Sequence, residues 1–395
     1  MSAAADPTAA VLELCQALVE DPSLGAVHDW KRRNPEGLAV GYMPIYVPQP
    51  LLEAIGCLPV AIFGGGDQLE IIRGDSIFQS YICHIPRSTV ELGLRGNLDV
   101  LDGMLFPSVC DVIRNLSGIW KLLFPGRYAS YLDLPQRFEP QLGGRFYVQE
   151  MRRIAGELAD RGAKALCDDA LRTAIARENE RRAALATLDE LRRAEPWRLP
   201  TSEAYLAVRV GAVLPTAEHT TLLEEFRTAV LQRPARFYDN VRVIVEGAFC
   251  EQPPLALIRT LENTGCFVVD DDFQLGVRAI QGAIEIDPGE DPLVALARAF
   301  LEQGAATATR YIDEGKKGAH LVQRVRAARA DGVIFVAASF CDPALLDQPM
   351  LEGALDEAGI SHTSFKFSEN TGQFQVIREQ AGAFSDSVKL WGKTA

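Results

Sequence analysis

The chain has 395 residues, of which 48% are hydrophobic and 24% are charged, and its formal net charge is −13. This length exceeds one compact core, so the composition predicts a globular protein of two or three domains. The excess of acidic residues argues against a general nucleic-acid or anionic-membrane surface, although a local basic patch can still bind a small anion. No apolar stretch is long enough to cross a bilayer and no secretory signal is visible, which predicts a cytoplasmic protein.

The first third of the chain alternates between helical and apolar segments. Residues 1–30 are predicted as one amphipathic helix, whose apolar face carries Val11, Leu14, Cys15 and Leu18. Apolar runs follow at 37–44, 58–64 and 101–108, and the helix-like segment 49–56 separates the first two. Apolar runs of this length that alternate with helical patterns are typical of a parallel α/β sheet.

The middle of the chain differs in character. Residues 146–195 and 202–233 show helical spacing, with a break near Pro215. The α/β pattern then resumes, with apolar runs at 240–250, 265–273, 331–341 and 360–368 and a helix-like segment at 374–392. This order predicts an α/β domain over residues 1–145, a helical connector over 146–235 and a second α/β domain over 236–395. The strand ends of the two α/β parts are similar in sequence, which favours a duplicated domain.

Three of the eight cysteines end apolar runs, each directly before an acidic residue: Cys110, Cys250 and Cys341. Ligands of open α/β sheets bind beyond the carboxyl ends of the strands. The acidic residue can cap the next helix, and a helix N-terminus favours the thiolate form that binds iron or zinc. Cys83 precedes Pro86 and is predicted on a loop. A small buried side chain is the alternative interpretation of each of these cysteines.

The absence of several motifs excludes some classes of metal and nucleotide site. The sequence contains no C-x-x-C, so zinc ribbons, thioredoxin-type sites and bacterial ferredoxin runs find no support. It also lacks a P-loop, and the glycines at 64–68 lack the third glycine of a dinucleotide fingerprint, which predicts a turn there. His84, beside Cys83, is either a proton donor or a loop histidine. Dispersed cysteines from two domains can still meet, and three thiolates around a [4Fe–4S] cluster would leave one iron open.

The stretch at 83–115, CHIPRSTVELGLRGNLDVLDGMLFPSVCDVIRN, resembles the 2-hydroxyacyl-CoA dehydratase and benzoyl-CoA reductase family. In that family a cysteine near Arg-Ser is followed by G-x-L-x-x-x-D-G and then by Cys-Asp. Residues 41–60 are similar to the family's P-x-E-x-x-x-A-x-G-x-x-P segment, and residues 265–280 to its D-D-x-x-x-G-x-R stretch. Residues 340–343 resemble the third cysteine motif, so the resemblance covers nearly the whole chain in the right order.

The resemblance implies two Rossmann-like α/β domains with one [4Fe–4S] cluster in the interdomain cleft. It further implies that Cys83, Cys110 and Cys341 bind this cluster and that its fourth site is not a cysteine. Cys250 stays outside the predicted ligand set because the family pattern does not demand a cysteine there, and its participation is left open. Arg87 and Arg114 either offset the cluster's charge or contact a CoA phosphate, or they form ordinary salt bridges.

Within this family, the length and residues 87–111 are most similar to the smaller non-ATPase subunit of ATP-dependent benzoyl-CoA reductases. The implied reaction adds electrons and protons to the ring of an aromatic acyl-CoA and yields a cyclic dienoyl-CoA. The implied partners are a larger homologous cluster-bearing subunit, two activator subunits that carry ATP and a further [4Fe–4S] cluster, and a ferredoxin as electron donor. A subunit of a 2-hydroxyacyl-CoA dehydratase and a non-catalytic scaffold subunit are the alternatives.

One position departs from the family pattern. Pro50 stands where the P-x-E segment has its acid, and Glu53 lies one helical turn away at the wrong spacing. In related dehydratases that acid lies near the substrate-binding cluster. The departure predicts that this chain relays electrons or shapes the cleft, while a partner subunit binds the substrate.

Overall fold

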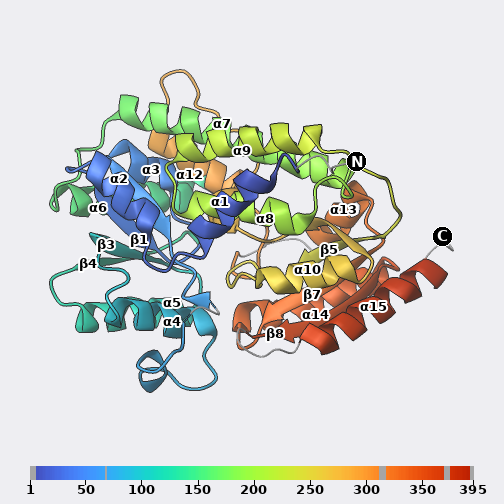
Figure 1. Ribbon diagram of the computed structural model, residues 1–395. Coiled ribbons are helices and arrows are strands. Elements are labelled where there is room, and N and C mark those ends of the chain that lie inside the picture. The colour runs from blue at the N-terminus through green and yellow to red at the C-terminus, as the bar shows by residue number, and fades with distance from the viewer. Residues whose placement is uncertain (1–5, 67–68, 311–316, 369–373, 392–395) are drawn as a thin grey trace.

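The computed structural model describes residues 6–66, 69–310, 317–368 and 374–391. Two four-stranded sheets, both entirely parallel, form its framework, so the predicted α/β fold is confirmed. Figure 1 shows the two sheets on opposite sides of the molecule, with helices packed around each. No helix within the described ranges is long and apolar enough to span a membrane.

The first sheet has the strand order β2-β1-β3-β4. Its strands are β1 (Leu38–Tyr42), β2 (Cys57–Ala61), β3 (Gly103–Pro107) and β4 (Tyr128–Leu132). The helices of this part are α1 (Ala9–Val19), α2 (Gly25–Arg33), α3 (Gln49–Ala54), α4 (His84–Leu94) and α5 (Asp111–Leu123), with a short 3-10 turn at Gly74–Ser76. Strands β1, β2 and β3 coincide with the three predicted apolar runs. Pro59 lies in β2, an edge strand, where its missing N–H leaves no neighbour unpaired.

The second sheet repeats this arrangement with the order β6-β5-β7-β8. Its strands are β5 (Val241–Glu246), β6 (Cys266–Asp271), β7 (Gly332–Ala338) and β8 (Ser361–Phe367). Its helices are α10 (Leu255–Asn263), α11 (Leu275–Arg278), α12 (Pro292–Gln303), α13 (Ala319–Ala328), α14 (Asp342–Glu357) and α15 (Phe374–Trp391). In both sheets the first strand is central, the second lies on one side of it and the third on the other. This shared order supports the predicted duplication.

Helices from the middle of the chain join the two parts. They are α6 (Arg145–Ala159), α7 (Asp168–Ala194), α8 (Thr201–Arg209) and α9 (Thr216–Gln232), with short turns at Pro140–Gly144 and Val210–Ala212. The long helix α7 contacts α3 from the first part and β6 from the second, and α9 packs along it (Figure 1). The predicted domain boundaries after residues 145 and 235 stay a prediction.

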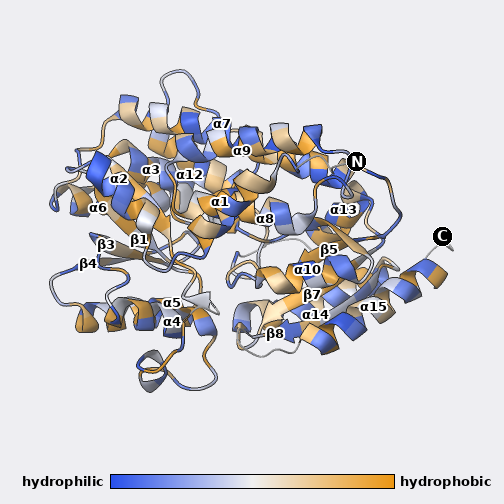
Figure 2. Cartoon of the chain, in the orientation of Figure 1, coloured by the Kyte–Doolittle hydropathy of each residue, from blue (hydrophilic) through white to orange (hydrophobic). Residues whose placement is uncertain are grey.

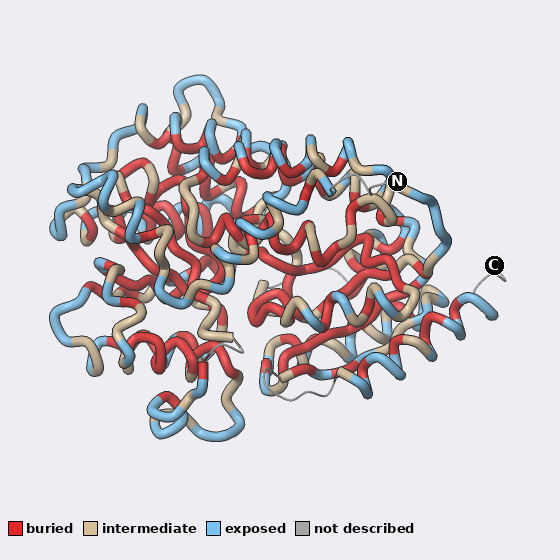
Figure 3. Tube along the Cα trace, in the orientation of Figure 1, coloured by how far each residue is buried: buried red, intermediate tan, exposed pale blue. Residues whose placement is uncertain are grey.

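Hydropathy and burial explain this architecture. Every residue of β2, β3, β6 and β7 is buried, and Figures 2 and 3 show apolar, buried strands flanked by helices with polar, exposed outer faces. The edge strand β4 alternates between buried and half-buried residues. Its short alternating pattern was not predicted, because YASYL contains no continuous apolar run.

Two further sequence predictions were wrong. The predicted helix over residues 1–30 is two helices, α1 and α2, because Pro22 follows the first and breaks it. Leu14, placed on its apolar face, is exposed, whereas Cys15 is buried. Residues 1–5 of that prediction, residues 67–68 of the glycine turn and residue 392 of the last helix lie outside the described residues.

The surroundings of His219 show that the middle helices are tightly packed. His219 is fully buried on α9, and its Nε2 lies 3.0 Å from the carbonyl oxygen of Ala207. A Cβ atom at Gly211 would lie 2.4 Å from the ring, so glycine is needed there. Burial, together with the positive charge of Arg181, lowers the pKa of His219 to about 3.

The pKa of His219 predicts that stability falls when the pH drops from 7 to 5. In the unfolded chain this histidine binds a proton with an ordinary pKa of about 6.5, whereas the folded chain keeps it neutral. The unfolded state therefore binds more protons in this window, and His219 alone lowers the free energy of unfolding by about 2 kcal/mol. Urea denaturation at the two pH values measures the change.

The His219→Gln variant is the matched control. It is expected to reduce the pH dependence without removing it, because burial lowers the pKa of His320 to about 4 and that residue remains. An unchanged pH dependence in the variant would contradict the assignment.

Candidate functional site

The three cysteines predicted as ligands occupy the same structural position. Cys83 is the N-cap residue of α4, Cys110 that of α5 and Cys341 that of α14. Cys110 and Cys341 follow the carboxyl ends of β3 and β7, as predicted, and Cys83 ends its predicted loop where α4 begins. Phe340, directly before Cys341, has a φ of 67°, a left-handed conformation that is strained for a non-glycine residue. The backbone therefore turns sharply to place Cys341.

The fold brings these three cysteines within electrostatic reach of one another. Burial raises the pKa of Cys83 well above its usual value, and the negative charges of Glu251, Cys341 and Cys110 raise it further. Burial also raises the pKa of Cys341 to about 12, and the charges of Glu251 and Cys110 add to this. Cys83 and Cys110 belong to the first α/β part, and Cys341 belongs to the second.

The helix N-termini lower the pKa of Cys110 and Cys341, in the predicted direction, but burial outweighs this effect in the metal-free chain. Burial raises the pKa of Cys110, although the backbone amides of Ile113 and Val112 lower it. The amide of Ala344 acts in the same way on Cys341, and burial again outweighs it. The backbone amides at the helix N-termini thus offset part of the increase in pKa that burial causes. A bound metal centre would displace the protons, because metal-bound thiols are deprotonated.

The acidic residues next to the cysteines differ from the prediction. Asp111 and Asp342 are the first residues of α5 and α14, so the cysteines themselves occupy the N-cap positions. Helix α10 begins only at Leu255, so Glu251 caps no helix and is 4% exposed beside the thiols. Sequence reasoning missed Glu251 as a site residue; the Cys-Glu pair at the end of β5 was the available signal.

The two predicted arginines have different surroundings. The guanidinium of Arg87 pairs with Asp75 at 2.8 Å, and its Nε donates a hydrogen bond to the carbonyl of Cys83 at 3.4 Å. Its positive charge lowers the pKa of Cys83. Arg114 is exposed on α5, one turn after Cys110. Contact of either arginine with a CoA phosphate stays a prediction.

The candidate donor set consists of three sulfur atoms from separate helix N-termini. Within the described ranges, no group of three or more His, Cys, Asp or Glu side chains is arranged to hold a metal ion. Three sulfur donors fit an iron–sulfur cluster in number and in softness. Cys83, Cys110 and Cys341 would hold it.

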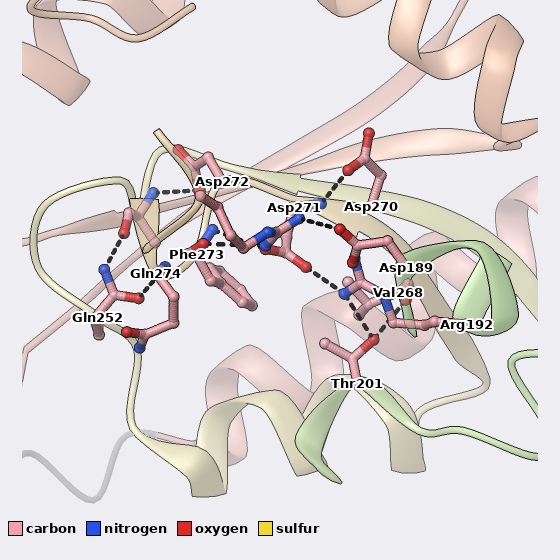
Figure 4. A network of polar contacts seen from close by, with 12 residues as sticks. Asp189, Arg192, Thr201, Gln252, Val268, Asp270, Asp271, Asp272, Phe273 and Gln274 are labelled. Atoms are coloured by element: carbon pink, nitrogen blue, oxygen red, sulfur yellow. Dashed lines mark hydrogen bonds and ion pairs between the residues drawn. The ribbon is translucent and has the colours of Figure 1, made fainter. Parts of the chain in front are cut away.

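The residues that match D-D-x-x-x-G-x-R shape the carboxyl end of β6 (Figure 4). Asp271 accepts hydrogen bonds from Arg192 on α7 and, at 2.8 Å, from Arg278. Asp272 accepts from the backbone N–H groups of Gly247 at 2.8 Å and Ala248 at 3.1 Å. A Cβ atom on Gly276 would lie 2.6 Å from the carbonyl oxygen of Pro44. The motif therefore fastens β6 to α7, to the loop after β5 and to the first part of the chain.

A cavity of about 610 Å³ lies beside this network. Four arginines line it, but each is paired with a carboxylate: Arg182 with Glu178, Arg193 with Asp270, Arg278 with Asp189 and Asp271, and Arg324 with Asp270 and Glu246. Positive charge that is already compensated attracts anions weakly. The cysteines, and not this cavity, therefore form the candidate functional site.

Comparison with known proteins places this geometry in a family. The profile of the 2-hydroxyglutaryl-CoA dehydratase D-component family matches residues 44–388. A subunit of the benzoyl-CoA reductase of Thauera aromatica is 48% identical over 385 residues, which cover 97% of this chain and 99% of the relative. The beta subunit of the (R)-2-hydroxyglutaryl-CoA dehydratase of Acidaminococcus fermentans is 28% identical, covering 89% and 92% of the two chains. The (R)-phenyllactyl-CoA dehydratase beta subunit of Clostridium sporogenes is 25% identical, covering 89% and 91%.

The fold and the similarity together define an enzyme subunit of an oxidoreductase and lyase family. The chain belongs to the benzoyl-CoA reductase and 2-hydroxyacyl-CoA dehydratase family, as its motifs predicted.

Removing the charge of Asp271 is expected to destabilise the fold. The Asp271→Asn variant removes the carboxylate that pairs with both Arg192 and Arg278, and it leaves the buried guanidinium of Arg192 with Asp189 alone, which costs about 3 kcal/mol. Chemical denaturation measures the loss. The matched control is Asp99→Asn, which removes an exposed partner of Arg127 and is expected to cost less than about 1 kcal/mol. Equal effects of the two variants would argue against the role of Asp271.

The thiol environments predict an order of alkylation in the metal-free, folded chain. Cys167 is exposed and should react first with iodoacetamide at pH 7. Cys341, with its pKa raised from 9.0 to about 12, holds about a thousandfold less thiolate than an ordinary cysteine and should react slowly. Peptide mass spectrometry over time measures both rates. Similar rates in the folded chain would refute the burial of the site, and the urea-unfolded chain is the control.

Proposed function

We propose that this chain is a subunit of an ATP-dependent benzoyl-CoA reductase and that it binds a [4Fe–4S] cluster through Cys83, Cys110 and Cys341. The observation that carries the proposal is the electrostatic proximity of these three thiols, of which Cys341 is buried and the other two are half-buried, in a chain that is 48% identical to a benzoyl-CoA reductase subunit. The cysteines come from separate helix N-termini of both α/β parts, so only the folded chain assembles the donor set.

A [4Fe–4S] cluster supplies one-electron transfer at low potential when it is bound. The residues around the thiols favour a low potential. Glu251 is buried among them, and its charge acts on both Cys83 and Cys341. The positive charge of Arg87 is shared with Asp75. Negative charge in a buried environment disfavours the addition of a further electron, so an electron held there is strongly reducing.

A strong reductant suits the proposed reaction. The aromatic ring of a thioester substrate takes up two electrons and two protons and becomes a cyclic dienoyl-CoA. The first electron removes aromaticity and is therefore the most difficult to add. We assign ATP hydrolysis to two activator subunits that carry a further [4Fe–4S] cluster and receive electrons from a ferredoxin, because this sequence contains no P-loop.

The residues near Pro50 support binding of the substrate by a partner subunit. Pro50 is buried in α3 and offers no acid. The carboxylate of Glu53 accepts a hydrogen bond from the backbone N–H of Thr216 at 3.1 Å, at the start of α9. This contact gives Glu53 a structural role. The homologous larger subunit is therefore the proposed site of the aromatic acyl-CoA.

A dehydratase subunit is the second candidate, favoured by the two more distant relatives, which are named dehydratase beta subunits. Such a subunit would act in the elimination of water from a 2-hydroxyacyl-CoA. The anaerobically purified complex, given ATP and a reductant, separates the two functions. We expect formation of dienoyl-CoA from benzoyl-CoA; dehydration of a hydroxyacyl-CoA without ring reduction would favour the alternative.

The ligand assignment predicts that Cys110→Ala and Cys341→Ala each lower the iron content to less than half of the about four irons expected for one cluster per chain. Loss of one of three protein thiolates leaves the cluster weakly held. Cys57→Ala is the control, because Cys57 is buried in β2 and belongs to the apolar core. Iron and acid-labile sulfide assays on the anaerobically purified full chain measure the effect.

A colourless, iron-free chain that still supports ring reduction with its partner subunits would overturn the proposal. That result would leave a non-catalytic scaffold as the function of this chain.

A further inference from the structure

Cys250 lies at the same edge of the second sheet as Cys341. It follows β5, and Cys341 follows β7. These strands are parallel neighbours, with Glu246 paired to Phe335, so their carboxyl ends lie side by side. Cys250 and Cys341 are 8% and 7% exposed, so both side chains are buried at this edge.

Cys250 is also within electrostatic reach of all three proposed ligands. Burial raises its pKa well above the usual value, and the negative charges of Cys341, Cys110 and Cys83 raise it further, in that order. The other buried cysteines have different neighbours. The groups that act on the pKa of Cys266 are Thr264, Lys389 and Ser385, and those that act on Cys57 are Asp102 and Lys31.

The loop that carries Cys250 is held in place from both sides. Asp272 accepts hydrogen bonds from the backbone N–H groups of Gly247 and Ala248, just before it. The side chain of Gln252, just after it, donates to the carbonyl of Ala248 at 3.3 Å and accepts from the backbone N–H of Gln274 at 2.9 Å. These contacts fix the backbone on both sides of Cys250, so its thiol is presented without the entropy cost of ordering a flexible loop.

We propose that Cys250 is the fourth thiolate ligand of the cluster that Cys83, Cys110 and Cys341 hold. The inference rests on the proposed function and deepens it. A small buried side chain would explain the burial of Cys250, but not its convergence with three other thiols from both halves of the chain. Four protein thiolates leave no iron open to a substrate. The chain would therefore transfer electrons and leave substrate binding to its partner, which agrees with the missing acid at Pro50.

Mild oxidation of the anaerobically purified full chain tests this inference without a mutation. A cluster with an open iron loses that iron to ferricyanide and becomes a three-iron cluster with its own electron paramagnetic resonance signal. We expect the parent chain to resist this conversion. The Cys250→Ala and Cys250→Ser variants should convert at least tenfold faster and lose about one of four irons.

Cys266→Ser is the matched control, because Cys266 is equally buried at the start of β6, away from the other thiols. It should resist oxidation as the parent does, and circular dichroism confirms that each variant is folded. Rapid conversion of the parent, or equal conversion of parent and Cys250 variants, would overturn the fourth ligand while leaving the cluster in place. A parent chain without iron would instead overturn the proposed function itself.

Discussion

The carboxyl ends of the parallel strands are the constraint on which the rest of this structure depends. In a sheet whose strands all run the same way, every loop that follows a strand leaves from the same edge. Both sheets obey this rule with the same strand order, so the loops after β5 and β7 leave from one edge of the second sheet and the loop after β3 leaves from the corresponding edge of the first. Cys110, Cys250 and Cys341 follow these strands. Cys83 joins them from the start of α4.

Burial of several thiols in one place has an electrostatic consequence. Burial raises the pKa of every member, and nearby negative charges raise it further, despite the helix termini that face Cys110 and Cys341. The thiols of the metal-free site therefore stay protonated, and binding of a positively charged metal centre would release these protons. The same negative surroundings suit a centre that must give up an electron readily.

The family motifs have two different roles in this fold: some supply the candidate ligands, and another holds the surrounding loops in place. The cysteine motifs supply the thiols, whereas D-D-x-x-x-G-x-R supplies no donor to the site. Its residues Asp271 and Arg278 pair with each other, Asp272 holds the loop before Cys250, and Gly276 permits a close approach to Pro44. A sequence motif near a functional site can thus exist to hold the loops that carry the chemistry.

Much of the secondary structure followed from local patterns, because long apolar runs and uninterrupted helical spacing have few alternative structures. Seven of the eight strands in the described ranges overlap predicted runs, and β4 was missed because its residues alternate between buried and half-buried and form no continuous apolar run. The exposure of Leu14 and Cys167 could not be read from the sequence, since helical spacing defines a face but not what covers it. Glu251 was missed because a buried acid and a capping acid look alike in sequence.

The sequence by itself determined the α/β class, the family, and the identity of three cysteines as candidate ligands, because these depend on residue order and short motifs. Only the tertiary structure decided which cysteines share one site. Position along the chain gave Cys250 the same strand-end setting as Cys110 and Cys341, but distance between the two sheets is a property of the fold. The packing of α7 against both parts, fastened by Arg192 and Asp271, belongs to that fold and leaves no trace in any single stretch of sequence.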